Sequence, residues 1–88
     1  MVDDGKVFAK RVLGAVEDVL AASDVCSENQ VLQHLRLEPG ERERVCLTMD
    51  WLERQGYLTG KANRGDNTVV DFVASDVTAT GRHWLASR

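Results

Sequence analysis

The sequence predicts a small α+β domain with three helices, a sheet of two or three strands and a C-terminal helix. Three observations predict this class. Apolar residues recur with helical spacing through the first half of the chain, a polar stretch containing glycine follows, and a β-branched run then occupies residues 68–73. Because 88 residues suffice for one compact unit and no linker or repeat is present, we expect a single domain over residues 1–88.

The first helix is predicted over residues 6–22. At about 100° per residue its apolar side chains form one broad stripe, which is typical of an amphipathic helix. The stripe consists of Phe8, Ala9, Val12, Leu13, Val16, Val19 and Leu20. Gly14 lowers the helix propensity of this segment, and we interpret it as a point of close packing.

The second helix is predicted over residues 28–36. Ser27 followed three residues later by Gln30 has the form of a capping box, in which each side chain bonds the backbone N–H of the other residue. Val31, Leu32 and Leu35 provide its buried side.

The third helix is predicted over residues 39–55. Pro39 suits the first position of a helix, and Gly56 is suited to a left-handed cap that ends it. Val45, Met49 and Leu52 line one side of this helix, whereas Leu47 and Trp51 project away from it. Two interpretations stay open. Either the rest of the domain surrounds the helix and buries Trp51, or Leu47 and Trp51 form an exposed apolar patch for a partner protein.

The remaining elements follow from β propensity and capping. Tyr57 and Leu58 predict a short strand, residues 60–67 a hairpin loop, and residues 68–73 a second strand. Asp71 interrupts the alternation of this strand, so its core face is not assigned. Thr78 is a plausible N-cap for a last helix over residues 79–87.

Composition excludes several classes of protein. The cysteines Cys26 and Cys46 lack CxxC spacing, and the histidines His34 and His83 are distant in sequence, so we expect no metal, no cofactor and two reduced structural thiols. We interpret His34 as a residue at the boundary of the core. The chain has no glycine-rich phosphate loop and no nucleophile elbow, and an enzyme is therefore not predicted. It also has no apolar run near 18 residues and no signal-peptide pattern, which favours a cytoplasmic protein without a membrane span.

The order of the predicted helices and strands in the second half of the chain resembles that of a known family of domains. The run from Trp51 through Gly56 to Leu58 is followed by the polar turn, which includes Lys61, Asn63, Arg64, Gly65, Asp66 and Asn67, by the β-branched strand, and by Val77-Thr78-Ala79-Thr80-Gly81-Arg82-His83-Trp84-Leu85. This order of helix, strand, turn, strand and helix resembles the winged helix-turn-helix domains of small bacterial transcriptional regulators. Such domains often place a short edge strand where Val25 stands.

The resemblance implies binding to double-stranded DNA, with the third helix in the major groove and the hairpin, or wing, against an adjacent groove or phosphate. On this chain the implied DNA-binding residues are Arg42, Arg44 and Thr48 on the helix and Lys61, Asn63 and Arg64 in the wing. It also implies a homodimer, and we expect it to join through the first and last helices, with Phe8, Trp84 and Leu85 as candidate contacts.

The charge of the chain favours a second hypothesis. The net charge is -3, whereas nucleic-acid-binding domains usually carry a basic excess that releases counterions from phosphate. Within the third helix, acidic residues also outnumber basic ones. The alternative function is therefore a winged helix that binds a protein through Leu47 and Trp51 and has little or no affinity for DNA.

Overall fold

The computed structural model describes residues 4–66 and 68–87, and within them it confirms the predicted α+β class. The elements in order are α1 (Asp4–Leu20), β1 (Cys26–Ser27), α2 (Glu28–Leu35), the 3-10 helix η1 (Pro39–Glu41), α3 (Arg42–Arg54), β2 (Leu58–Gly65), β3 (Thr68–Val77) and α4 (Ala79–Ala86).

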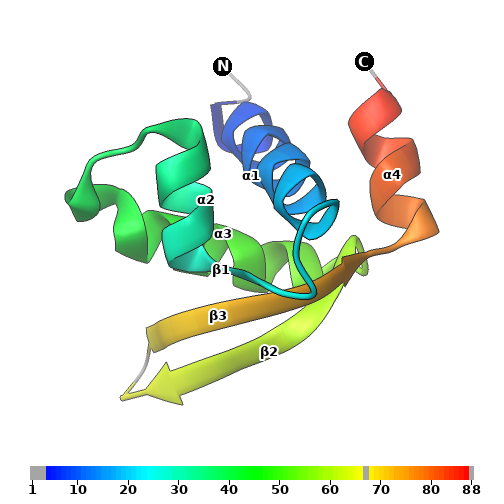
Figure 1. Cartoon of the computed structure of the whole chain (residues 1–88). Coiled ribbons are helices and arrows are strands. Elements are labelled where there is room, and N and C mark those ends of the chain that lie inside the picture. The colour runs from blue at the N-terminus through cyan, green and yellow to red at the C-terminus, as the bar shows by residue number, and fades with distance from the viewer. Residues whose placement is uncertain (1–3, 67, 88) are drawn as a thin grey trace.

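The strands form one antiparallel sheet in the order β1-β3-β2, and α1, α2 and α3 cover one of its faces (Figure 1). The short strand β1 follows α1 along the chain and forms one edge of the sheet, where Cys26 pairs with Ala74. It begins one residue after Val25, where the edge strand was expected. Helix α4 lies beside α1 at the end of β3 (Figure 1). The core fills the space between the helices and the sheet, with Val12, Leu13 and Phe72 among its fully buried side chains.

The helix boundaries follow their local signals. The capping box of α2 is confirmed, because Ser27 N donates to Gln30 Oε1 at 2.8 Å and Gln30 N donates to Ser27 Oγ at 3.4 Å. The predicted third helix is wrong in its first turn, where Pro39–Glu41 forms a separate 3-10 helix before α3 begins at Arg42. Gly56 has a φ of 82°, which confirms the left-handed residue predicted after this helix.

The prediction of a long hairpin loop over residues 60–67 is wrong. Strand β2 continues to Gly65 and pairs with β3 along its whole length, from Leu58 opposite Val77 to Gly65 opposite Thr68. Asn67 lies outside the described residues, so the connection comprises only Asp66 and that position. The polar composition of β2 was misleading because Lys61 and Asn63 occupy its solvent face, where polar side chains are compatible with a strand.

Two irregularities in β3 explain why its sequence does not alternate. In β3, Val70 has no partner, because its neighbours Val69 and Asp71 pair with the consecutive β2 residues Arg64 and Asn63. Ser75 is skipped in the same way, between the partners of Gly60 and Thr59. Each skipped residue is therefore the extra residue of a β-bulge. The bulges keep four side chains on the core face despite their uneven spacing. These buried residues are Val69, Phe72, Ala74 and Val77.

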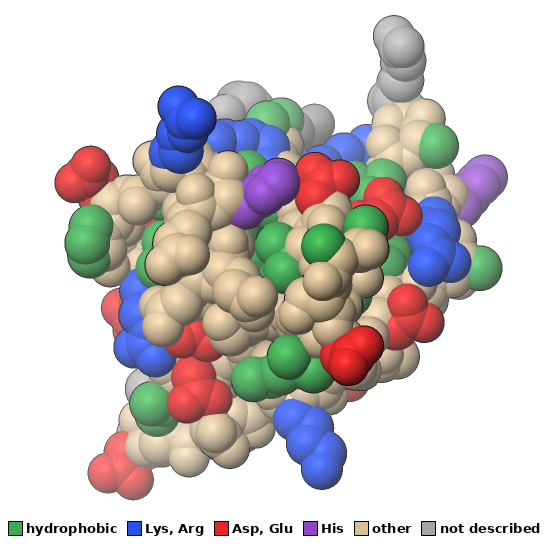
Figure 2. Space-filling model, viewed as in Figure 1, with side chains coloured by type: hydrophobic (Ala, Val, Ile, Leu, Met, Phe, Trp, Pro, Cys, Tyr) green, Lys and Arg blue, Asp and Glu red, His purple; other side chains and the backbone are tan. Residues whose placement is uncertain are grey.

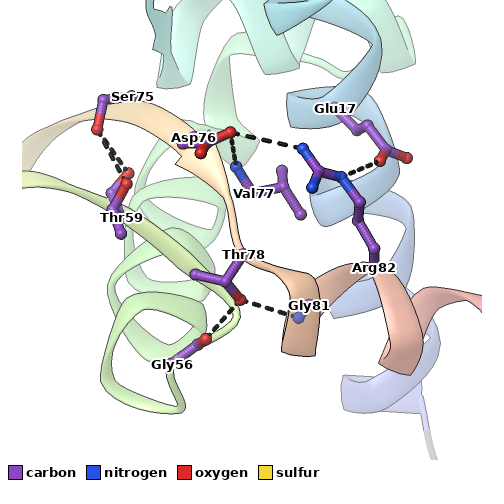
Figure 3. Close-up of polar contacts among 9 residues, drawn as sticks. All are labelled: Glu17, Gly56, Thr59, Ser75, Asp76, Val77, Thr78, Gly81 and Arg82. Atoms are coloured by element: carbon purple, nitrogen blue, oxygen red, sulfur yellow. Dashed lines mark hydrogen bonds and ion pairs between the residues drawn. The ribbon is translucent and has the colours of Figure 1, made fainter.

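Helix α4 is attached at the point where α3 ends. Thr78 Oγ1 donates to the Gly56 carbonyl at 2.7 Å and accepts from Gly81 N at 2.9 Å, which confirms Thr78 as the N-cap (Figure 3). A Cβ added at Gly81 would overlap the Tyr57 carbonyl oxygen. The close approach expected at Gly14 is wrong, because a Cβ there would have no heavy atom within 4 Å.

Both thiols are buried and unbridged, as predicted. Burial disfavours the charged thiolate and raises the pKa of Cys26 to about 11 and that of Cys46 to about 11. Cys46 Sγ lies 3.8 Å from the Val70 carbonyl oxygen, beside the bulge of β3. The two sulfur atoms therefore belong to the interior of the domain and are poor nucleophiles at neutral pH.

Candidate interaction surface of the third helix

The outer face of α3 carries a ridge formed by Leu47 and Trp51. Helix geometry places both residues on the side opposite Val45, Met49 and Leu52, which are fully buried. Leu47 is 47% exposed and Trp51 is 39% exposed. The interpretation in which the domain encloses Trp51 is therefore wrong, and the Leu47–Trp51 ridge is accessible from outside.

Trp51 is held in place by two aromatic neighbours. Its ring lies 6.1 Å from the ring of Tyr57 in an edge-to-face arrangement and 6.1 Å from the ring of Trp84, centroid to centroid. Tyr57 and Trp84 stack on each other at 4.5 Å, and Lys10 Nζ lies 5.2 Å from the Trp84 ring centroid. Trp51 is thus packed into an aromatic cluster while 39% of the residue stays exposed, and these contacts fix the direction of its side chain.

A shallow depression lies on each side of the ridge. The first, of about 580 Å³, runs between the start of α1 and α3, and its lining includes Lys6, Ala9 and Glu43. The second, of about 480 Å³, lies between α3 and the end of the hairpin, and its lining includes Arg54 and Arg64. Leu47 and Trp51 line both depressions, so the ridge separates them.

Arg42, the first residue predicted to bind DNA, bonds a buried carboxylate. Glu28 is only 3% exposed, and its Oε2 accepts from Arg42 Nε at 3.0 Å and Nη2 at 2.9 Å. Its other oxygen, Oε1, accepts from Phe72 N at 3.2 Å. Bonding to Glu28 and its charge raise the pKa of Arg42. The Glu28 carboxylate therefore joins α2 to both α3 and β3, and the Arg42 guanidinium is its partner from α3.

Arg64, the predicted wing residue, points back towards α3. Its Nη2 donates to Asp50 Oδ1 at 2.7 Å, and Arg54 Nη2 lies 3.0 Å from Asp50 Oδ2. Asp50 is 4% exposed. Because two arginines share this buried carboxylate, the acidic residue in the middle of α3 does not act as an isolated surface charge.

The other residues of the DNA-binding prediction lie on separate surfaces. Arg44 is on the outer face of α3, with its guanidinium 3.8 Å from the Phe8 ring centroid and an ion pair to Glu41 at 3.1 Å. Thr48 Oγ1 donates to the Arg44 carbonyl at 2.7 Å. On the solvent face of β2, Lys61 is exposed, and Asn63 Nδ2 donates to Asp71 Oδ1 at 2.8 Å.

The predicted dimer contacts are largely used inside the domain. Phe8 is 5% exposed and lies under Arg44, so it offers almost no surface to a partner. Trp84 and Leu85 are half-buried against the core, and Trp84 stacks on Tyr57. Arg82 also ties α4 to α1 through Glu17 at 3.2 Å (Figure 3).

Charges of both signs are interspersed over the face seen in Figure 2, without a continuous basic stripe. The exposed His34 contacts Asp18 at 3.1 Å. Among the described residues no group of three or more histidine, cysteine, aspartate or glutamate side chains is placed to hold a metal ion. In the same residues no helix is long and apolar enough to cross a membrane.

Comparison with models of protein families, with curated proteins and with solved structures found no match to this chain.

Sequence reasoning missed the two buried carboxylates, although a signal for one of them exists. Glu28 precedes Val31, Leu32 and Leu35 by three, four and seven positions, and it therefore continues their apolar stripe. An acidic residue in such a stripe requires a basic partner. The partner, Arg42, is 14 positions away and belongs to another helix, and no local pattern identifies it.

Proposed function

We propose that this domain is a winged helix that serves as a protein-interaction module, with the outer face of α3 as its binding surface. The order α1, β1, α2, α3, β2, β3 and α4, with β3 in the middle of the sheet, supports the winged-helix part of the proposal. In this arrangement α3 is the helix that DNA-binding members insert into the major groove.

The observation that carries the functional part is the exposed Leu47–Trp51 ridge. Apolar side chains at the centre of an exposed helix face are suited to the desolvated centre of a protein interface, where tryptophan is among the most effective residues. A helix inserted into DNA instead needs polar or basic groups at this position to reach base edges. Here Arg42 is bonded to Glu28, while Arg44, which lies on the outer face, packs on the Phe8 ring and pairs with Glu41.

A comparative capture experiment tests this function. The purified domain is immobilised as the wild type, as Trp51→Ala and as the control Val25→Ala, which alters an exposed apolar residue that lines neither depression. We expect a protein from an extract of the producing cells to bind the wild type and Val25→Ala and to be lost with Trp51→Ala. Thermal unfolding of all three must show that each is folded. Equal capture by all three would contradict the proposal.

A small DNA-binding transcriptional regulator is the second candidate, and the exposed Lys61 on the solvent face of β2 favours it. A lysine there would position the hairpin through a phosphate contact. Fluorescence anisotropy with random duplex DNA, at salt concentrations from about 50 to 200 mM, tests this candidate. If the domain binds DNA in this way, its affinity should weaken steeply as the salt concentration rises. The slope of log affinity against log salt concentration should fall in magnitude by about one for Lys61→Ala and stay unchanged for Arg11→Ala on α1.

A further inference from the structure

We propose that the outer face of α3 binds a second copy of this chain, with the two α3 helices packed antiparallel about a twofold axis. This inference rests on the proposed protein-binding function and names the partner. It also moves the dimer contact from the first and last helices, where Phe8 is buried and Trp84 is stacked on Tyr57, to the third helix.

The shape of the surface is self-complementary. A twofold interface requires one patch to fit a rotated copy of itself. The Leu47–Trp51 ridge has a depression of about 580 Å³ on one side and another of about 480 Å³ on the other. The ridge of one copy can therefore enter a depression of the other while its own depression receives the partner's ridge, as in the packing of helix ridges into grooves.

One pair of opposite charges on the same face is also placed for a twofold contact, beside the basic side chains of Lys6 and Arg44 in the first depression and of Arg64 in the second. Glu43 lies near the start of α3 and lines the first depression, while Arg54 is its last residue and lines the second. Eleven positions, about three turns, separate them, so both lie on the side of the Leu47–Trp51 ridge. An antiparallel arrangement brings each Glu43 towards the other copy's Arg54, whereas a parallel one brings like charges together.

Two features of Arg54 allow it to take part. Its side chain is 60% exposed, and the Asp50 carboxylate that it contacts also receives Arg64 at 2.7 Å. Asp50 therefore keeps a partner when Arg54 turns towards another molecule. The interface is small, because a 13-residue helix is only about 20 Å long, and we expect a weak dimer whose population depends on concentration.

Sedimentation equilibrium of the purified chain, from about 5 to 500 µM, tests the proposal. We expect the wild type and the control Val25→Asp to form dimers over this range. Leu47→Asp and Trp51→Ala should weaken dimerisation at least tenfold. Circular dichroism must show that all variants are folded.

Charge exchange tests the antiparallel arrangement. Glu43→Arg and Arg54→Glu should each weaken self-association, and an equimolar mixture of the two should form a heterodimer, because opposite charges then face each other at both ends. Arg54→Gln, which adds no carboxylate beside Asp50, replaces Arg54→Glu if the latter fails to fold. A mixture that associates no better than its components would contradict this arrangement.

The result also separates this inference from the proposed function. A wild type that stays monomeric over the whole range, or a dimer that is unaffected at Leu47 and Trp51, overturns the second copy as the partner. The capture experiment then decides the broader function, which is upheld by Trp51-dependent binding of a different protein and contradicted when no protein binds.

Discussion

Glu28 and Asp50 show how single side chains connect the elements of this small domain. Each carboxylate is nearly inaccessible, and each is bonded by arginine from a different segment of the chain. Burying a charge is costly unless it is paired, but removal of one partner from such a pair costs more than the pair contributes. Arg42 and Arg64 are therefore needed by the fold itself, whatever the domain binds.

We expect Arg42→Met to lower the free energy of unfolding, because Glu28 would be left buried without its counter-charge. The loss should be smaller than that for breaking a fully buried pair, since the Arg42 side chain is 44% exposed. Urea denaturation measures the change. Arg11→Met, on the exposed side of α1, is the matched control, and an equal effect of both substitutions would contradict this role of Arg42.

Substitution of two helical glycines by alanine should change the stability of the domain in opposite directions. Gly81→Ala should destabilise the domain by about 1 to 3 kcal/mol, because its Cβ would overlap the Tyr57 carbonyl oxygen and push α4 away. Gly14→Ala should instead stabilise it by about 0.5 to 1 kcal/mol, since α1 gains helix propensity and the Cβ enters open space. Thermal unfolding of the two variants should shift the midpoint in opposite directions, and a shift in the same direction would disagree with the packing described here.

At the scale of elements, one hydroxyl group connects the end of α3 with the start of α4. Thr78 Oγ1 donates to the Gly56 carbonyl just beyond α3 and accepts from the N–H of Gly81 in α4. The contact adds a tertiary link to an ordinary N-cap. The backbone N–H of Thr78 also donates to the carbonyl of Tyr57, whose ring belongs to the aromatic cluster.

Thr78→Ala should therefore cost more than an average cap, about 2 kcal/mol in the free energy of unfolding. The substitution should also increase hydrogen exchange in α4 more than in α3, because the backbone N–H of Gly81 in α4 loses its hydrogen-bond acceptor. Thr80→Ala, at an exposed position of the same helix, is the control. Uniform exchange changes across the domain would indicate that the hydroxyl group does not act locally.

At the scale of the whole molecule, the buried thiols predict a decline in stability at alkaline pH. The unfolded chain releases thiol protons near pH 9, whereas the folded chain retains them until about pH 11. Ionisation of the thiols thus favours the unfolded state. Their contribution to the free energy of unfolding is complete below pH 9 and is lost progressively as the pH rises from 9 to about 11. A difference of two pH units corresponds to a loss of at most about 3 kcal/mol for each thiol.

Denaturation in urea at several pH values, with a reducing agent present, measures this decline. Cys46→Ala should make the free energy of unfolding fall less steeply between pH 9 and 11, even if its value at pH 7 is lower than that of the wild type. Because tyrosine and lysine also titrate in this range, the comparison of slopes isolates the thiol. Equal slopes for the two proteins would contradict its burial.

Local patterns predicted much of this fold, but contacts between distant segments were not predictable. The capping box at Ser27, the left-handed residue at Gly56 and the cap at Thr78 depend on neighbours in sequence, and all were identified. The length of β2 was missed because it depends on pairing with β3. For the candidate site, the projection of Leu47 and Trp51 was evident from helical spacing, whereas the bonding of Arg42 and Arg64 to buried carboxylates required the tertiary structure.

The aromatic cluster has a spectroscopic consequence. Both tryptophans of the chain belong to it. Trp51 is partly exposed on the outer face of α3, and Trp84 is part of α4. Intrinsic fluorescence therefore originates entirely from the border between these two helices. Any molecule that covers the ridge should shift the emission to shorter wavelength without an added label, and detachment of α4 should shift it to longer wavelength. Emission from the two tryptophans thus reports directly on the surface at which we propose that a second copy binds.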